Sequence, residues 1–219
     1  MTKRKLVDGI AIDLVLLPDP RTMQMAIDAN REITGGQWKI VLSLDTCLPH
    51  ITLAMGAILA EAIGSLNLDV HTYFAKIPPL DLMISRIASE VIPTGETISE
   101  YQIARSPEIL NLHQTAFSLL KEYALTSVRL TMLYQEPKPE KITLSWIRNW
   151  LHDYHKQPYL PPRASEAQFH PHITLGVGEY KKSLEHPIAF TADRIAICQL
   201  GNYCTCRKIL AETKLREVS

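Results

Sequence analysis

The feature that most constrains this 219-residue chain is a repeated pentapeptide. Residues 49–53 and residues 171–175 both read Pro-His-Ile-Thr-Leu, and a glycine follows each copy within three residues, at Gly56 and at Gly176. In a β-strand, residues two apart point to the same face. Each copy therefore presents one histidine beside one threonine, while its isoleucine and leucine face a core. The repeat predicts a duplicated structural unit in which each copy supplies half of one site.

The paired residues suit proton transfer at a phosphate group. Histidine has an ordinary pKa of about 6.5, so a neutral imidazole can accept a proton from a nucleophile while a protonated one gives a proton to a leaving group. Threonine hydroxyls donate hydrogen bonds, which are strong when the acceptor is a charged phosphate oxygen. We therefore expect the catalytic residues of a metal-independent phosphoryl site to be His50, Thr52, His172 and Thr174.

The two His-x-Thr-hydrophobic tetrapeptides, one in each half of the chain, resemble those of the 2H phosphoesterase superfamily, which includes the 2′-5′ RNA ligase and RNA 2′,3′-cyclic phosphodiesterase group. A single copy would be weak evidence, because threonine and solvated histidine both occur in ordinary half-exposed strands. Two identical, proline-preceded copies favour a site. The resemblance implies an α+β, bilobal fold in which two antiparallel sheets form a central cleft with helices outside. We expect one such domain over residues 1–219.

The resemblance also implies an activity, namely the opening of 2′,3′-cyclic phosphates at RNA ends or on nucleotides, with no cofactor and no metal. One motif histidine would deprotonate water and the other would protonate the departing ribose oxygen; the repeat does not say which. Several alternatives stay open. They are a phosphodiesterase for 2′-5′-linked oligonucleotides or another cyclic nucleotide, a 2′-5′ RNA ligase, and a nucleotide- or RNA-binding module without turnover.

Charge and hydropathy bound the partners. The formal net charge is zero, from 23 basic and 23 acidic residues, so the chain lacks the broad basic surface of a protein that follows a long nucleic-acid backbone. We expect the partner to be a nucleotide or RNA end that carries a cyclic phosphate. Asp8 and Asp13 interrupt the apolar stretch that a signal peptide needs, and no apolar run approaches the length of a membrane helix. We therefore expect a cytoplasmic protein without membrane contact. We also expect a monomer.

Five further residues are candidates for substrate binding, because arginine binds phosphate and an aromatic ring or imidazole can stack on a base. A solvated arginine or a core aromatic is the alternative for each. His170 precedes His172 by two residues and so shares its face. His152 and His155 have helical spacing, but no third metal ligand accompanies them in the sequence, so we expect no metal site. The five candidates are Tyr101, Arg105, Arg163, Phe169 and His170.

The cysteines show no C-x-x-C pattern, so in a reducing cytosol all of them are expected to be free thiols. Cys204 and Cys206 are expected to share one face of a strand, as small residues that pack. The remaining two are Cys47 and Cys198.

Hydrophobic periodicity and turn residues predict the elements around the motifs. Besides the motif strands, we expect strands at residues 9–17, 38–44, 68–75, 80–92, 98–104, 188–200 and 203–210. We expect helices after a Thr22 cap, directly after Gly56, from a Ser106 cap to Tyr123, and over residues 140–155. The last helix lies in a segment, residues 126–165, that is longer than a crossover needs. We interpret this segment as a helical insertion near the site.

Overall fold

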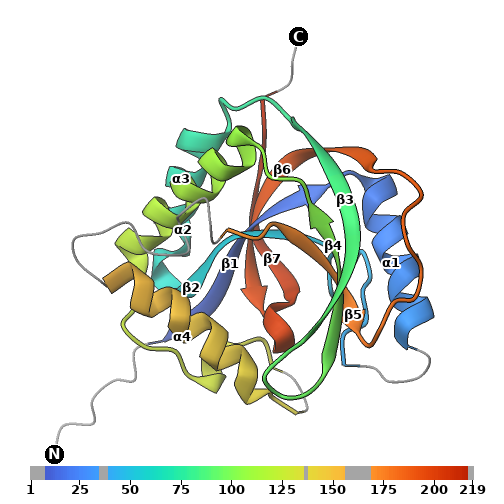
Figure 1. The fold of residues 1–219 in the computed structure, drawn as a ribbon. Helices are drawn as coiled ribbons and strands as arrows, with labels where there is room; N and C mark the ends of the chain where they lie inside the picture. The colour runs from blue at the N-terminus through green and yellow to red at the C-terminus, as the bar shows by residue number, and fades with distance from the viewer. Residues whose placement is uncertain (1–7, 35–38, 136–137, 156–168, 217–219) are drawn as a thin grey trace, which may run out of the picture.

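The computed structural model describes residues 8–34, 39–135, 138–155 and 169–216, and Figure 1 shows their arrangement. Seven strands form one antiparallel sheet in the order β1-β2-β5-β4-β3-β6-β7. The strands are β1 (Gly9–Pro18), β2 (Ile51–Leu59), β3 (Leu80–Val91), β4 (Thr97–Ile103), β5 (His172–Val177), β6 (Ile188–Leu200) and β7 (Cys206–Lys214).

The sheet closes on itself through its longest strand. β6 pairs with β3 through residues 188–192 and with β1 through residues 192–199, while β7 lies along its later part. β2 and β5 meet at the register pair Ile51 and Ile173. The α+β prediction with antiparallel strands is confirmed, and the strands expected to form two sheets are joined in one continuous sheet.

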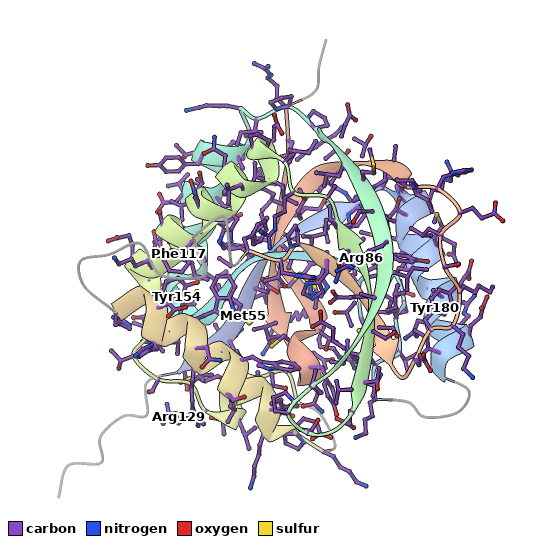
Figure 2. All side chains as sticks on the ribbon, viewed as in Figure 1. Met55, Arg86, Phe117, Arg129, Tyr154 and Tyr180 are labelled. Atoms are coloured by element: carbon purple, nitrogen blue, oxygen red, sulfur yellow. A yellow bond between two sulfur atoms is a disulfide. The ribbon has the colours of Figure 1, made fainter. Side chains whose placement is uncertain are left out.

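Among the described residues, four α-helices lie outside the sheet (Figure 1), and three of them pack on a motif strand. α1, which precedes β2, packs on β5, while α3, which precedes β5, packs on β2 together with α4. Figure 2 shows Phe117 of α3 close to Tyr154 of α4, whose hydroxyl donates to the carbonyl of Met55 at 2.9 Å. The helices are α1 (Pro20–Thr34), α2 (Ile63–Phe74), α3 (Pro107–Tyr123) and α4 (Lys141–His155).

The ends of several elements were predicted correctly. Ser106 caps α3, since its hydroxyl accepts a hydrogen bond from the amide of Ile109, and the helix ends at Tyr123 as expected. The helix expected at residues 140–155 is α4. The prediction of Thr22 as the N-terminal cap of α1 was wrong. Asp19 caps this helix, because its side-chain oxygen accepts a hydrogen bond from the amide of Thr22 at 2.8 Å. That residues 126–165 are an insertion in one domain stays a prediction.

The strand expected at residues 38–44 was wrong in its described part. Only an isolated bridge between Ser43 and Cys47 is present there. The buried side chain of Asn30 takes the place of a neighbouring strand, because it donates to the carbonyl of Ile40 and accepts from the amide of Leu42. A side chain from a helix thus satisfies backbone groups that a ladder would otherwise pair.

The region after the first motif also differs from the prediction. β2 runs through Gly56 to Leu59, so the helix expected directly after Gly56 begins only at Ile63. The strand expected at residues 68–75 was wrong, because this segment lies largely in α2. Its apolar residues Leu66, Val70 and Phe74 are buried at intervals of four, and that helical spacing outweighs their strand propensity.

The cysteine prediction was wrong for one pair. Cys198 of β6 and Cys206 of β7 form a disulfide with their Cα atoms 5.4 Å apart, while Cys47 and Cys204 are free and buried. The pairing of two neighbouring strands brings the sulfurs together, which sequence spacing does not reveal. Cys204 lies in a 3₁₀ turn, Asn202–Cys204, before β7 and not within it.

The disulfide bears on location. Disulfides are typical of oxidising compartments, so a cytoplasmic location stays a prediction. Across the described residues, none of the helices combines the length and the apolar character needed to cross a bilayer.

Candidate active site

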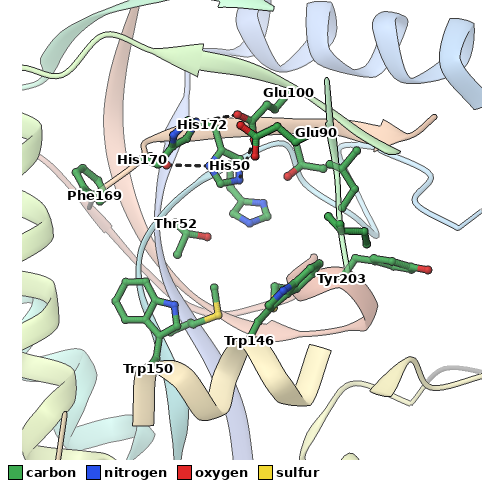
Figure 3. Close-up of a pocket in the computed structure, with 15 residues that line it drawn as sticks. His50, Thr52, Glu90, Glu100, Trp146, Trp150, Phe169, His170, His172 and Tyr203 are labelled. Carbon is green, nitrogen blue, oxygen red and sulfur yellow. Dashed lines mark hydrogen bonds and ion pairs between the residues drawn. The ribbon is translucent and has the colours of Figure 1, made fainter. Parts of the chain in front are cut away.

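The two motif copies lie side by side at the centre of the sheet. Ile51 and Ile173 are register partners and are fully buried in the core. Because side chains alternate across a strand, the flanking residues point to the other face, into a cleft of about 440 Å³ (Figure 3). The fold therefore brings all four predicted catalytic residues into one cavity; they are His50, Thr52, His172 and Thr174.

The ring of the first histidine is oriented by a hydrogen bond to the backbone just before β2. His50 Nδ1 donates to the carbonyl of Leu48 at 2.7 Å, which leaves Nε2 facing the cleft, 3.7 Å from Oδ2 of Asp13 on β1. Burial lowers the pKa of His50 to about 4, and the electrostatic effect of His172 acts in the same direction, while hydrogen bonds to the backbone of Leu48 and Cys204 oppose both. His50 is therefore a neutral imidazole at neutral pH.

The first threonine shares the same carboxyl group. Thr52 Oγ1 donates to Asp13 Oδ2 at 2.6 Å. Asp13 is fully buried, and burial raises the pKa of its carboxyl well above the ordinary value although the bond from Thr52 opposes this. Its second oxygen, Oδ1, has no hydrogen-bond partner in the described part of the chain.

The second histidine has the same local geometry in a different setting. His172 Nδ1 donates to the carbonyl of His170 at 2.9 Å, and its Nε2 lies 3.7 Å from Oε2 of Glu100 on β4. Its side chain is 37% exposed, against 10% for His50. Glu100 is buried, and its other oxygen lies 2.8 Å from His170 Nε2 and accepts a bond from Gln102. The second imidazole thus faces a carboxylate and solvent together.

The wall opposite the motifs is aromatic and apolar (Figure 3). Trp146 and Trp150 project from α4 toward the histidines, and the ring of Tyr203 lies 6.4 Å from that of Trp146. We did not predict these residues as part of the site. The signal was present in the spacing of the tryptophans, because residues four apart lie on one face of a helix. The other apolar residues of the lining are Met55, Ile92 and Ile98.

The further substrate-binding candidates separate into three groups. Phe169 and His170 line the cleft, but the Phe169 ring is buried and stacks on His113 with ring centroids 4.0 Å apart, as a core aromatic does. Tyr101 pairs with Ile173 and is buried, so it lies on the core face and does not fit a substrate-binding role. Arg105 follows β4 and is not among the cleft-lining residues, and Arg163 lies outside the described residues.

The chain matches no protein-family model and no curated protein, but it matches solved structures over almost its whole length. For TT0787 of Thermus thermophilus, the TM-score is 0.56 at 14% identity, covering 96% of this chain and 100% of that chain. For E. coli LigT complexed with ATP the TM-score is 0.53 at 12% identity, covering 96% and 99%. For E. coli LigT complexed with phosphate it is 0.51 at 13% identity, again covering 96% and 99%.

Similarity at this level of identity defines the fold. The chain has the fold of TT0787, of E. coli LigT and of a further solved structure described as a phosphoesterase, and this agrees with the fold expected from the two motifs.

Proposed function

We propose that this protein is a metal-independent phosphodiesterase that opens 2′,3′-cyclic phosphates of nucleotides or RNA ends by two-histidine general acid–base catalysis. The observation that carries this proposal is the convergence of two complete His-x-Thr copies on one cleft, at the place where β2 meets β5. Binding alone requires no pair of proton-transfer groups, whereas hydrolysis of a phosphodiester requires a base on one side and an acid on the other.

The environments of the two histidines suggest their roles. His50 is neutral at neutral pH, and its Nε2 faces the cleft, so it is suited to take a proton from the attacking water. His172 is more exposed and has the Glu100 carboxylate beside Nε2, and we assign it the complementary role, donation of a proton to the leaving oxygen. Water oxygen then bonds to phosphorus, the bond from phosphorus to one ribose oxygen breaks, and that oxygen receives the proton from His172. The product is a nucleoside 2′- or 3′-phosphate.

The threonines would hold the phosphate in different ways. The hydroxyl of Thr174 lines the cleft and is available to a non-bridging oxygen. The hydroxyl of Thr52 donates to Asp13 in the absence of substrate. Because burial raises the pKa of Asp13, this carboxyl can hold a proton and donate it to Thr52 Oγ1, which frees the Thr52 hydrogen for the phosphate. The buried carboxyl would then support binding without adding a negative charge.

The neighbouring structures support a nucleotide as the ligand. E. coli LigT is described in complexes with phosphate, with NADP+ and with ATP. In this chain the cleft is large enough for a small ligand, and the Trp146 ring faces the motif residues across it. We propose that the phosphate lies on the motif side and the nucleobase against the aromatic side, where stacking tolerates any base.

The test is turnover of a panel of 2′,3′-cyclic mononucleotides and a cyclic-phosphate-ended RNA oligomer in EDTA, comparing wild type with the His50→Ala, His172→Ala double variant. We expect hydrolysis by the wild type alone. Turnover that is equal in the two proteins, or that requires added metal, would contradict the mechanism. The panel also contains 2′-5′-linked and 3′,5′-cyclic substrates and a pair of RNA ends for ligation, so that a rival activity of the same groups would be seen.

A further inference from the structure

A second set of groups lies around the His172 imidazole and points to a metal ion. Glu100, His170 and His172 each offer one ligand atom, and these atoms all lie within 4.8 Å of one another. His170 Nε2 is 2.8 Å from one oxygen of Glu100, and His172 Nε2 is 3.7 Å from the other. The first residue comes from β4 and the other two from the entry to β5. Sequence spacing alone did not show that Glu100 lies beside His170 and His172.

The distances suit a small tetrahedral ion. Bonds of about 2.0–2.1 Å to nitrogen and oxygen place the ligands of tetrahedral Zn²⁺ about 3.3 Å apart. The two Glu100 oxygens lie 2.8 Å from His170 Nε2 and 3.7 Å from His172 Nε2, respectively, and one ligand atom from each residue fits within 4.8 Å. Two imidazoles and one carboxylate form the three-ligand set of open zinc sites, in which the fourth position is left to water or substrate. Mg²⁺ and Ca²⁺ prefer six or more oxygen ligands, so imidazole nitrogen is a poor match for them.

The ligands are also positioned by outer contacts. His172 Nδ1 donates to the carbonyl of His170, which fixes the ring so that Nε2 faces Glu100. The buried carboxylate of Glu100 is held by Gln102, whose own oxygen accepts from Arg86. Supports of this kind orient metal ligands and strengthen binding.

The first motif provides an internal comparison. Its histidine also has a carboxyl group 3.7 Å from Nε2, supplied by Asp13. The residue two positions before it is Leu48, where the second motif has His170, so the first copy lacks a second imidazole. The difference confines the three-ligand set to the second motif within the described residues.

We propose that Glu100, His170 and His172 form a binding site for Zn²⁺ or a similar transition-metal ion, and that the bound ion inhibits the enzyme. The bound ion occupies the Nε2 lone pair of His172, so this nitrogen can no longer carry the proton for the leaving group. Removal of the ion restores it. The proposed metal binding does not depend on the proposed phosphodiesterase function, whereas the proposed inhibition rests on it.

Binding is tested without any assay of turnover. Protein stripped with chelator is titrated with Zn²⁺ against a chromophoric chelator, and with Co²⁺ to record the visible bands of a tetrahedral complex. His170→Leu, which gives the second motif the local sequence of the first, should weaken Zn²⁺ binding more than about 100-fold, beyond the loss typical of a merely supporting group. Glu100→Gln should weaken it at least about tenfold. His50→Ala, the matched control in the other copy, should bind as wild type does.

Equal affinity in wild type and His170→Leu would overturn the site, and so would an equal loss in His50→Ala, which would place the ion between the two motifs. The second arm measures turnover of a 2′,3′-cyclic nucleotide. Zn²⁺ should inhibit the wild type at the concentration that fills the site, EDTA should reverse this, and the activity left in His170→Leu should resist the same concentration. Undiminished turnover with the site filled would overturn the inhibition. If no substrate is turned over at all, the proposed function fails while the binding arm still decides the metal site.

Discussion

The two copies of the pentapeptide have the same sequence and the same backbone contact, yet they lie in different surroundings. In each copy, Nδ1 of the histidine donates to the carbonyl two residues earlier, and Nε2 lies 3.7 Å from a carboxyl group on the neighbouring strand. In the first copy, the carboxyl is the fully buried Asp13 and the preceding residue is Leu48. In the second, the carboxyl is Glu100 and the preceding residue is His170.

The comparison indicates that the motif sets the orientation of each histidine ring, while the neighbouring residues set the polarity and exposure around it. An Nδ1–carbonyl bond sets which nitrogen faces the cleft in both copies. Burial then keeps His50 neutral, while exposure and a second imidazole give His172 a more polar setting. A duplicated unit can in this way supply a base and an acid from identical residues.

The largest expected effect is the loss of either histidine. His50→Ala and His172→Ala should each lower kcat/KM by about 10²- to 10⁴-fold, because each removes one proton-transfer step. Steady-state turnover of a 2′,3′-cyclic nucleotide measures this. His152→Ala, which removes an exposed imidazole on α4, is the matched control and should retain the wild-type rate. A normal rate in either motif variant would remove that copy from the mechanism.

The next effect is a dependence of the free energy of unfolding on pH that we expect from His50 of the first copy. Burial lowers the pKa of His50 from 6.5 to about 4, so between these values the unfolded chain binds a proton that the folded chain does not. The contribution of His50 to stability is therefore complete above pH 6.5 and is lost as the pH falls to about 4, by about 3 kcal/mol in total. Urea unfolding at pH 7 and pH 4.5 should show a smaller loss for His50→Gln than for wild type. Equal losses would place His50 in a solvated environment.

The aromatic residues of the cleft belong to neither motif copy. Substitution of Trp146 therefore tests whether the substrate lies between the motifs and α4. Trp146→Ala should raise KM for a cyclic mononucleotide by an amount equivalent to about 1–3 kcal/mol, the usual value for stacking on one base. Trp146→Phe should retain most of the affinity. Ribose 2′,3′-cyclic phosphate, which has no base, should respond little to either substitution; an equal response would mean that Trp146 acts through the fold.

The smallest expected difference lies between the threonines. Thr52→Val removes the donor to a buried carboxyl and should lower the free energy of unfolding by about 1–2 kcal/mol, whereas Thr174→Val should leave it close to wild type. Both should lose activity. Urea unfolding of the two variants side by side gives the comparison, and equal stability would show that the bond to Asp13 contributes little.

The sequence predicted the residues that act locally but not those brought in by strand pairing. The repeat alone located His50 and His172, and a Ser-Pro helix start located α3. Asp13 entered the sequence analysis only as a charge that breaks an apolar run. Its place beside Thr52 follows from the pairing of β1 with β2, and Glu100 reaches His172 through the pairing of β4 with β5.

The same reason explains the errors. The disulfide between Cys198 and Cys206 depends on the pairing of β6 with β7, and the loop that replaces the strand expected at residues 38–44 depends on the side chain of Asn30. Neither contact leaves a local pattern. Register between distant segments is set by the packing of the whole sheet.

The most direct test of the central claim, that identical motifs carry out different steps, uses the leaving group. Hydrolysis of a 2′,3′-cyclic nucleotide is compared with hydrolysis of a nucleotide p-nitrophenyl phosphodiester, whose nitrophenolate departs without a proton. We predict that His172→Ala is strongly impaired on the cyclic phosphate and much less on the aryl ester, whereas His50→Ala is impaired on both. Equal losses on both substrates for both variants, or the reverse pattern, would contradict the assignment of His50 as base and His172 as acid.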